Sequence, residues 1–562
     1  MPLLELRNLA VYFKAEKQEF AAVQGLNFSL NAGESLAIVG ESGSGKSVSL
    51  KAMMGLLPQR AIARIEGEAL FTRDNKTVDL LKLSQKELRP YRGKGLAMIF
   101  QEPMTALNPV MRCGEQILEA VLLHTKLKGK EAKNRVLALL EEVRVSETER
   151  IYKSYPHEVS GGQRQRVMIA MALAGDPQVL IADEPTTALD VSVQASILEL
   201  LKRLKEERGM ALIFISHDLG VVKQIADRCL VMFRGVKLEE QNADDLFRSP
   251  QHVYTKALLA CRPGARTPGT RLPVMRDFFD LTEEGEFIPK TLAPGYEALH
   301  TRPEQNPYLK IEDLKVSYLE SGAWASKQKK EVIHGLDFEI FKGETLGLLG
   351  ESGSGKSTLG RAIMQLIRYS GKVWLEGKNL NGKDSLSRRK LSAKIQLIYQ
   401  DPYASLNPVL RVGDALDEVM LVHGEGDSKK RKAACIAMLE RVGLSESDLA
   451  KYPHEFSGGQ RQRISIARAL LCKPEFIVCD ESVAALDVSV QAQVLNLLME
   501  LKAEFGLTYL FITHDLQVVK HIADRVLVLN KGGIADLQAT ADLFRNPQDE
   551  YTKNLLEAYP VA

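Results

Sequence analysis

An internal duplication limits what this chain can fold into more than any other feature of its sequence. The octapeptide Gly40–Ser47 recurs without change at Gly350–Ser357. The segment Tyr155–Leu173 matches Tyr452–Leu470 at 15 of 19 positions, and the shared segments keep the same order in both copies. A unit of about 250 residues is far longer than the roughly 20–50 residues of a solenoid repeat. We therefore expect two domains of the same fold in tandem.

The segment between the two copies is rich in proline. Seven prolines fall there: Pro263, Pro268, Pro273, Pro289, Pro294, Pro303 and Pro307. Because the segment has little helical or strand periodicity, we interpret it as a linker that follows the surface or stays mobile, with a small ordered appendage as the alternative. The expected organisation is a first domain at 1–262, a linker at 263–307 and a second domain at 308–562.

Composition excludes several classes of protein. Of 562 residues, 45% are hydrophobic and 26% charged, as in ordinary globular proteins. Lys and Arg number 74 and Asp and Glu 72, so the net charge of +2 gives no global basic excess for binding nucleic acid. No apolar run approaches the roughly 18–20 residues of a membrane helix, and the N-terminus lacks a signal-peptide pattern.

The six cysteines include no C-x-x-C pair, which argues against a zinc ribbon or an iron–sulfur cluster. We expect free thiols in a reducing cytosol.

Short apolar runs between helical patterns indicate an α/β fold. Residues 35–39 form such a run and end at a glycine-rich loop, after which 46–57 has helical character and is closed by Pro58. Residues 179–182 and 212–215 are further continuous apolar runs. Such strands are typical of a parallel sheet covered on both faces. The second copy repeats the pattern.

The repeated octapeptide is a G-x-x-x-x-G-K-S phosphate-binding loop, or P-loop, placed between a predicted strand and a predicted helix. Backbone N–H groups form an anion nest there, and the helix N-terminus adds its dipole. The lysine places a cation on the β- and γ-phosphates, and the serine offers a hydroxyl to Mg²⁺. The residues are Gly40, Glu41, Ser42, Gly43, Ser44, Gly45, Lys46 and Ser47, and Gly350, Glu351, Ser352, Gly353, Ser354, Gly355, Lys356 and Ser357.

A pair of acids ends one apolar run in each copy: Asp183-Glu184 and Asp480-Glu481. The strand end aims the Asp at the phosphate pocket, where it can orient Mg²⁺ through water, and the Glu can polarise the attacking water.

A third motif, Ser-Gly-Gly-Gln, precedes an arginine-containing helix in each copy. Its hydroxyl and helix N-terminus can bind a phosphate that the same copy's P-loop does not hold, which indicates the nucleotide of the other copy. The residues are Ser160, Gly161, Gly162 and Gln163, and Ser457, Gly458, Gly459 and Gln460.

These motifs, with Gln101/Gln400, the repeated Ala-Leu-Asp and His217/His514, together resemble the ATP-binding cassette ATPases. The resemblance covers nearly all of both copies. It implies two P-loop NTPase cassettes in tandem, each with a RecA-like α/β lobe and a helical lobe. It also implies that the cassettes bind ATP and Mg²⁺ and pair head to tail within one chain.

The resemblance also implies individual roles. Glu184 and Glu481 are the catalytic carboxylates, and His217 and His514 the switch histidines at the γ-phosphate. Gln101 and Gln400 reach Mg²⁺ together with Ser47, Asp183, Ser357 and Asp480. Asp190 and Asp487 lie at the seam between the cassettes. Phe13 and Tyr318 stack on adenine. Tyr12, which adjoins Phe13, is a second aromatic at the first of these places.

Finer features are similar to the dipeptide/oligopeptide/nickel importer ATPases, above all the fused ATPases of microcin C/peptide and glutathione importers. Both copies carry Leu-Asn-Pro after the glutamine, Tyr-Pro-His-Glu before Ser-Gly-Gly-Gln, and a related tail at 250–259 and 547–556. The resemblance implies two permeases and a solute-binding protein as partners, and a peripheral position on the cytoplasmic face of the inner membrane. It implies no nucleic-acid partner.

Alternatives remain open on the sequence alone. A soluble cassette protein acting on ribosomes or DNA also lacks membrane helices, and a motor with a single working site or an exporter is a further alternative. The proline-rich linker and the absence of zinc-ligand cysteine pairs argue against the first, and the presence of both Glu184 and Glu481 against the second. Ser482 stands where the first copy has Pro185, a departure that alters the loop at the second site.

Overall fold

The computed structural model describes residues 1–14, 19–186, 190–265, 267–282, 284–291, 306–321, 327–382, 387–401, 405–424, 426–484 and 486–557. The Ala-Leu of each repeated Ala-Leu-Asp falls wholly or partly outside these ranges, as do Pro294 and Pro303 of the linker.

The first half contains two sheets. A four-stranded antiparallel sheet has the order β2-β1-β4-β5, and a six-stranded sheet has the order β10-β9-β3-β8-β7-β6, parallel except for β10. The strands are β1 (Leu4–Lys14), β2 (Glu19–Leu30), β3 (Ser35–Val39), β4 (Ile62–Arg73), β5 (Lys76–Asp79), β6 (Leu96–Ile99), β7 (Val179–Asp183), β8 (Ala211–Ser216), β9 (Arg228–Phe233) and β10 (Val236–Asn242). Strands β3, β7 and β8 are buried throughout, because helices cover the parallel sheet.

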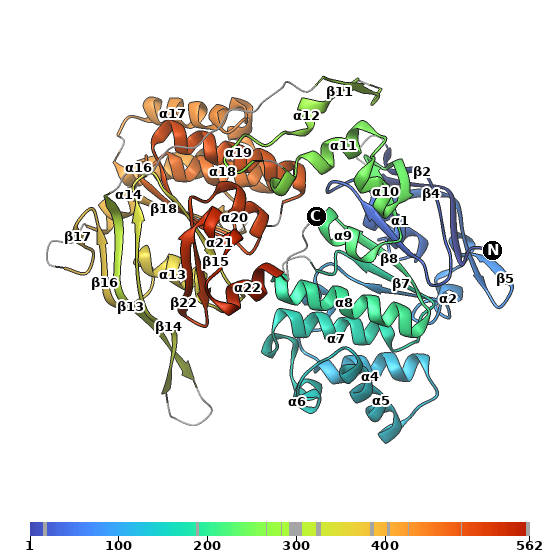
Figure 1. Ribbon diagram of the computed structural model, residues 1–562. Helices are drawn as coiled ribbons and strands as arrows, with labels where there is room; N and C mark the ends of the chain where they lie inside the picture. The colour runs from blue at the N-terminus through green and yellow to red at the C-terminus, as the bar shows by residue number, and fades with distance from the viewer. Residues whose placement is uncertain are drawn as a thin grey trace.

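The helices of the first half are α1 (Lys46–Met53), η1 (Leu80–Lys82), α2 (Gln85–Leu88), α3 (Pro103–Ala106), α4 (Cys113–His124), α5 (Gly129–Glu142), α6 (Thr148–Lys153), η2 (Pro156–Glu158), α7 (Gly161–Leu173), α8 (Val191–Arg208), α9 (Leu219–Ile225), α10 (Ala243–Arg248) and α11 (Val253–Ala260). Helices α4 to α7 form a helical lobe beside the sheets (Figure 1).

The second half repeats this architecture, with sheet orders β14-β13-β16-β17 and β18-β19-β20-β15-β21-β22. Its strands are β13 (Pro307–Ser321), β14 (Lys327–Phe341), β15 (Thr345–Leu349), β16 (Ser370–Leu375), β17 (Lys378–Asn379), β18 (Ile395–Ile398), β19 (Phe476–Asp480), β20 (Thr508–Ile512), β21 (Arg525–Asn530) and β22 (Gly533–Ala539). Its helices are α13 (Lys356–Ile363), α14 (Arg388–Lys394), α16 (Val412–His423), α17 (Ser428–Arg441), η4 (Glu446–Ala450), η5 (Pro453–Glu455), α18 (Gly458–Leu470), α19 (Val488–Phe505), α20 (Leu516–Ile522), α21 (Thr540–Arg545) and α22 (Glu550–Glu557).

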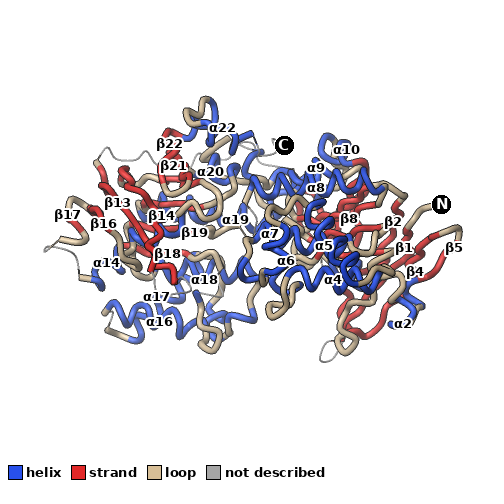
Figure 2. The backbone as a smooth tube through the Cα atoms, turned by 90° about the horizontal axis from the view of Figure 1, so that it is seen from below, coloured by secondary structure: helices blue, strands red, loops and turns tan. Residues whose placement is uncertain are grey.

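The two halves lie side by side with their antiparallel sheets at opposite ends and helices between them (Figure 2). The described part of the linker forms η3 (Pro263–Ala265), α12 (Met275–Phe278), β11 (Phe279–Leu281) and β12 (Phe287–Pro289). Of these, α12 and β11 lie at the top of the molecule in Figure 1. One buried apolar cluster combines residues of the first half and the linker, such as Leu258 and Leu272, with residues of the second half, such as Leu495 and Leu498. The apolar core is therefore continuous across the linker.

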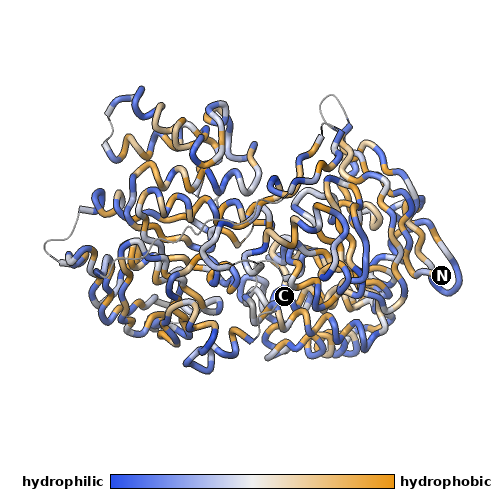
Figure 3. The backbone as a smooth tube through the Cα atoms, turned by 45° about the horizontal axis from the view of Figure 1, so that its top comes forward, coloured by the Kyte–Doolittle hydropathy of each residue, from blue (hydrophilic) through white to orange (hydrophobic). Residues whose placement is uncertain are grey.

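Hydrophobic and hydrophilic positions alternate over short stretches in both halves (Figure 3). Within the described residues, no helix is both long enough and apolar enough to cross a bilayer.

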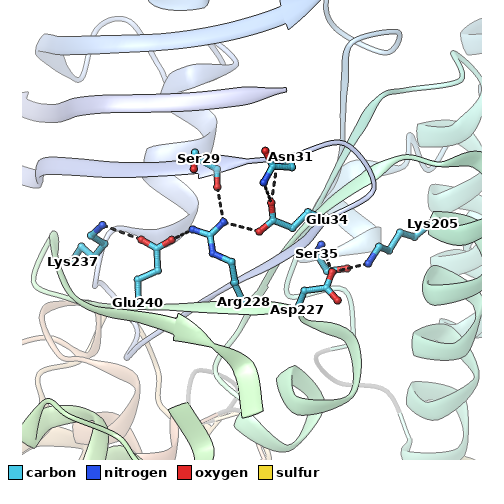
Figure 4. A network of polar contacts seen from close by, with 9 residues as sticks. All are labelled: Ser29, Asn31, Glu34, Ser35, Lys205, Asp227, Arg228, Lys237 and Glu240. Carbon is cyan, nitrogen blue, oxygen red and sulfur yellow. Dashed lines mark hydrogen bonds and ion pairs between the residues drawn. The ribbon is translucent and has the colours of Figure 1, made fainter. Parts of the chain in front are cut away.

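A polar network closes the end of the first parallel sheet (Figure 4). Arg228, at the start of β9, donates to Glu34 at 2.6 Å. The neighbouring Asp227 accepts from the backbone N–H of Ser35 and from the Lys205 ammonium, both at 2.8 Å. The network fixes β9 against β3, and so fixes the strand that leads into the P-loop.

Candidate functional site

The first P-loop connects β3 to α1, and its backbone shape depends on glycine. Gly40 has φ 148°, and a Cβ there would lie 2.1 Å from the carbonyl oxygen of Met232. Gly45 caps α1 in a left-handed conformation. The Lys46 ammonium donates to the carbonyl oxygens of Gly40 and Glu41, both at 2.8 Å. The loop is thus held in a ring around its lysine, with α1 starting at its end.

The second P-loop has the same geometry. Gly350 has φ 146°, and a Cβ there would lie 2.3 Å from the carbonyl oxygen of Leu529. Lys356 donates to the carbonyls of Gly350 at 2.6 Å and Glu351 at 2.9 Å. Burial lowers the pKa of both loop lysines, despite nearby carboxylates that favour the charged form. A bound polyphosphate would supply the negative charge that these ammonium groups need.

Two of the three predicted metal-binding residues of each copy, the serine and the aspartate, meet at the foot of its P-loop. The Ser47 hydroxyl donates to Asp183 at 2.6 Å, and Ser357 donates to Asp480 at 3.0 Å. Asp183 is fully buried, and burial raises the pKa of both aspartates. The second carboxylate oxygen of Asp183 accepts no hydrogen bond from the described residues and faces the Lys51 ammonium at 3.5 Å.

This donor set fits magnesium. A hydroxyl, an amide oxygen and a carboxylate are the hard oxygen ligands that Mg²⁺ prefers, and the buried Asp183 oxygen is available to a cation. Among the described residues, no group of three or more His, Cys, Asp or Glu side chains could hold a metal by itself.

A glutamine and a histidine hold the second acid of each pair. Gln101 donates to Glu184 at 2.9 Å, and His217 Nδ1 lies 3.3 Å from the same carboxylate. In the second half Gln400 donates to Glu481 at 2.7 Å, and His514 Nδ1 lies 3.6 Å from it.

The pKa values of these groups reflect the contacts. Burial alone would lower the pKa of His217 and His514, but the glutamates raise it above its usual value. Burial alone would raise the pKa of Glu481, but the contact with His514 lowers it. Glu481 is therefore held as a carboxylate beside the second P-loop.

The backbone of both glutamates is strained. Glu184 has φ 46° and Glu481 has φ 49°, in the left-handed region that residues with a side chain rarely adopt. Each amide donates to the end of the adjacent strand, at Ile215 and Ile512. Strain of this kind clusters at functional sites, because the surroundings must fix the residue.

The two Ser-Gly-Gly-Gln segments cap the helices of the helical lobes. Ser160 accepts from the N–H of Gln163 and donates its own N–H to that glutamine's side chain, and Ser457 and Gln460 repeat this box. The second glycine is required by packing, since a Cβ on Gly459 would lie 2.3 Å from a methyl carbon of Val490. Both serines are exposed.

The predicted seam residues bring the two halves together at the P-loops. Asp487, at the start of α19, accepts from the backbone N–H of Ser42 at 3.3 Å. Next to it, Ser489 donates to Glu41. In the reciprocal contact Ser192, on α8, donates to Glu351 at 2.6 Å. Each P-loop therefore touches the segment that follows the acidic pair of the opposite half.

Asp190 is the residue before α8, and its negative charge acts on Lys356 of the other half, as that of Asp487 acts on Lys46.

The predicted adenine-stacking residues lie at equivalent positions of β1 and β13. Phe13 is half-buried and Tyr318 is 41% exposed. The Arg64 guanidinium covers the ring of the neighbouring Tyr12 at 3.9 Å. Of the two adjacent aromatics, Phe13 is thus the one whose ring is not covered by this arginine.

Two tyrosines that hold the P-loops were not among the predicted site residues. The Tyr254 hydroxyl, on α11, accepts from the backbone N–H of Glu41 at 3.2 Å, and Tyr551, on α22, does the same for Glu351 at 3.0 Å. The signal was present in the sequence, because both tyrosines occupy the same place in the repeated tail. Lys51, which faces Asp183, carried no such signal.

The linker reaches the first site as well. The buried Asn496 of α19 binds the backbone of Leu272 twice, accepting from its N–H at 2.7 Å and donating to its carbonyl at 2.8 Å. Residues of α12 and β11, including Arg276 and Asp280, then line a cavity of about 540 Å³ beside the first P-loop and Asp487. The linker thus contacts both the first P-loop region and the second-half helix α19 that faces it.

Two models of known protein families match this chain. The family model described as "ABC transporter" matches residues 23–187 and 333–484, and the model described as "Oligopeptide/dipeptide transporter, C-terminal region" matches residues 238–277. The chain belongs to the ABC transporter family. The expectation of two tandem cassettes of an ATP-hydrolysing enzyme is confirmed.

The chain is also similar to curated proteins over its full length. It is 46% identical to the glutathione import ATP-binding protein GsiA of Escherichia coli (strain K12), and 44% identical to that of Pectobacterium atrosepticum. Each alignment covers 100% of this chain and 90% of the relative. A solved dimeric ATP-binding cassette with ADP and phosphate is 30% identical over 43% of this chain and 98% of its own, with a TM-score of 0.38. The curated relatives and the two family models confirm the expected resemblance to fused peptide and glutathione importer ATPases.

Proposed function

We propose that this chain is the ATP-hydrolysing motor of an importer for peptides or peptide-like solutes, with the tripeptide glutathione among the candidates. The relatives' names support the transported class. The contacts that support the motor are those that cross between the halves, from Asp487 to Ser42 and from Ser192 to Glu351. Two permeases and a solute-binding protein would complete the transporter, with this chain peripheral on the cytoplasmic face of the inner membrane.

Each ATP site would be built from both halves of the chain. Site one would use the first P-loop with Glu184 and His217, facing Asp487 and the segment 457–460. Site two would use the second P-loop with Glu481 and His514, facing Asp190 and the segment 160–163. Phe13 and Tyr318 would stack on the two adenines.

Within each site the chain's own residues bind the phosphates and position the attacking water. The P-loop N–H groups and Lys46 or Lys356 neutralise the β- and γ-phosphates. Glu184 or Glu481 accepts the proton of the water, and the histidine beside it orients the side chain.

Ser47, Gln101 and Asp183 would hold Mg²⁺ at site one, as Ser357, Gln400 and Asp480 would at site two. The ion would supply neutralisation of the negative charge on the phosphates.

Coupling would follow from the shared sites. ATP binds both halves at once and therefore favours the closed pair, while hydrolysis and release remove the bridging phosphate and favour the open pair. The permeases would respond to that shift. The boundaries 1–262, 263–307 and 308–562 remain our proposed division of the chain.

Uptake in cells tests this proposal. A strain that lacks the gene would be complemented with the wild type or with the Glu184→Gln/Glu481→Gln variant, and uptake of labelled glutathione and of di- and tripeptides measured. We expect uptake with the wild type only, and the protein in the membrane fraction when the permeases are present. Normal uptake in the strain that lacks the gene, together with sedimentation of the protein with ribosomes in the complemented strain, would instead support a soluble cassette factor.

A further inference from the structure

The duplication allows one place in the fold to be compared between the two halves. In the first half, Arg208 at the end of α8 binds Glu142 at 2.6 Å and Asp176 at 2.8 Å. Its side chain is only 12% exposed. This ion-pair cluster joins the C-terminal ends of α5, α7 and α8.

The second half carries different chemistry at the same three positions. Phe505 ends α19 where Arg208 ends α8, Arg441 ends α17 where Glu142 ends α5, and Lys473 follows α18 where Asp176 follows α7. Both acids have become cations, and the central cation has become an aromatic ring that is 48% exposed. The cluster that joins these helix ends in the first half therefore cannot form.

The residues that surround His124 in the first half also differ from those that surround its counterpart, His423, in the second half. In the first half the ring of His124 packs against Gly93 and Gly175, so closely that a Cβ on Gly93 would lie 2.2 Å from it. In the second half Cys472 stands at the position of Gly175, and Ser392, which aligns with Gly93, lies within α14. His423, the counterpart of His124, instead lines a cavity of about 880 Å³.

The lining of this cavity combines apolar surface with positive charge. Met420, Met438, Leu470 and Leu471 contribute apolar side chains beside Phe505. The cations of the lining are Arg389, Lys390, Lys430, Arg441 and Lys473.

Among the described residues, few carboxylates compensate the charge of this lining. No aspartate or glutamate of the described ranges lines the cavity. Arg441 pairs with Glu504. Across the part of the chain that the structure describes, the other four cations form no ion pair.

We propose that this cavity, at the C-terminal ends of α16, α17, α18 and α19, binds an anionic amphiphile, a carboxylate or phosphate group on an apolar chain. Its volume is that of a small-molecule site, which typically spans about 300–1,000 Å³ and combines apolar walls with a few polar groups. The apolar chain would cover the methionines, leucines and Phe505, and the head group would meet the cations of the lining. This ligand is independent of the transported solute and of the two ATP sites.

Calorimetric titration of the full-length protein with dodecanoate, below its micellar concentration, tests the proposal. The key variant, Arg441→Glu/Lys473→Asp/Phe505→Arg, rebuilds in the second half the ion-pair cluster of the first. We expect saturable binding of dodecanoate by the wild type and at least tenfold weaker binding by this variant. Lys473→Glu alone should weaken binding severalfold, which keeps the test informative if the triple variant unfolds.

Matched probes and a matched variant separate this site from general adsorption. Dodecan-1-ol should bind at least tenfold more weakly than dodecanoate, and acetate should not bind at millimolar concentration. Asp176→Asn, a charge change at the equivalent place of the first half, should leave dodecanoate binding unchanged.

Two results would overturn the proposal: equal binding of dodecanoate by the wild type and both second-half variants, or equal binding of the alcohol and the carboxylate. Vesicles distinguish the source of the ligand. Co-sedimentation with phosphatidylglycerol vesicles that is lost in the triple variant would identify a bilayer lipid, whereas binding of free dodecanoate without vesicle binding would identify a soluble amphiphile.

Discussion

Replacement of Asn496 by leucine should release the linker from the second half. The asparagine is 4% exposed, and its amide satisfies both backbone groups of the fully buried Leu272. Leucine is similar in size but leaves that N–H and that carbonyl without partners. A buried polar group without a partner costs about 1–3 kcal/mol, so two cost at least about 2 kcal/mol.

The linker can avoid this cost only by detaching, which exposes Leu272 and Val274 to water instead. Hydrogen exchange at the Leu272 amide measures the effect directly, because it reports the free energy of local opening. A loss of about 2 kcal/mol corresponds to exchange that is roughly 30-fold faster. Mass spectrometry of peptides that contain residue 272 would detect this.

Glu199 provides the matched control. It occupies the position in α8 that Asn496 occupies in α19, but it is exposed and pairs with Arg144 at the surface. Such pairs contribute about 0–1 kcal/mol, so Glu199→Leu should leave exchange at residue 272 unchanged. Equal exchange in wild type and Asn496→Leu would refute the assignment of this asparagine as the linker's anchor.

Three further predictions concern the ATP sites and the sheet that supports them. Glu184→Gln and Glu481→Gln should each retain ATP binding but slow hydrolysis by roughly 10²-fold or more, since an amide cannot accept the proton of water; turnover at the wild-type rate would reject the general base. Tyr254→Phe should weaken nucleotide binding at the first site about two- to tenfold, because the Glu41 N–H loses a hydrogen bond worth about 0.5–1.5 kcal/mol. Tyr551→Phe should have the same effect at the second site. Unchanged affinity in equilibrium titrations would show that these hydroxyls are dispensable. Burial raises the pKa of Asp227, but the hydrogen bonds from Lys205 and from the Ser35 N–H together lower it by more. The pKa of Asp227 in the folded protein therefore lies below the unfolded value of about 3.9. Its stabilisation is complete above that value and is lost as pH falls through the folded pKa, so thermal unfolding should show a shallower acid-side decline in Asp227→Asn than in the wild type, and parallel profiles would contradict this.

The chemistry of the sites could be predicted from sequence because it depends on residues that are close together along the chain. A P-loop must combine its glycines, lysine and serine within eight positions, and the acids must follow a buried strand directly. The structure places Ser47 against Asp183, two residues that the motifs assign to one site, whereas the contact of Gln101 with Glu184 is a finding of the structure.

Contacts between distant residues could not be predicted in this way. In the sequence, Asn496 is an ordinary position of an amphipathic helix. Nothing in the sequence near Leu272 indicates that the backbone of Leu272 pairs with the Asn496 side chain. The cavity at Phe505 is likewise invisible in one copy alone. It becomes apparent only when Arg441, Lys473 and Phe505 are set against the ion-pair cluster of the first half.

If each ATP site combines both halves of a single chain, cysteines introduced by Ser42→Cys and Asp487→Cys should form a disulfide within that chain. In the structure the backbone N–H of Ser42 lies 3.3 Å from the Asp487 carboxylate. The variant would be oxidised with ATP present and analysed by non-reducing electrophoresis and mass spectrometry. We expect the two cysteines to crosslink within one chain, so that the product keeps the mass of a 62.4 kDa monomer. A crosslink that joins two chains, or none in a folded protein that binds ATP, would contradict it.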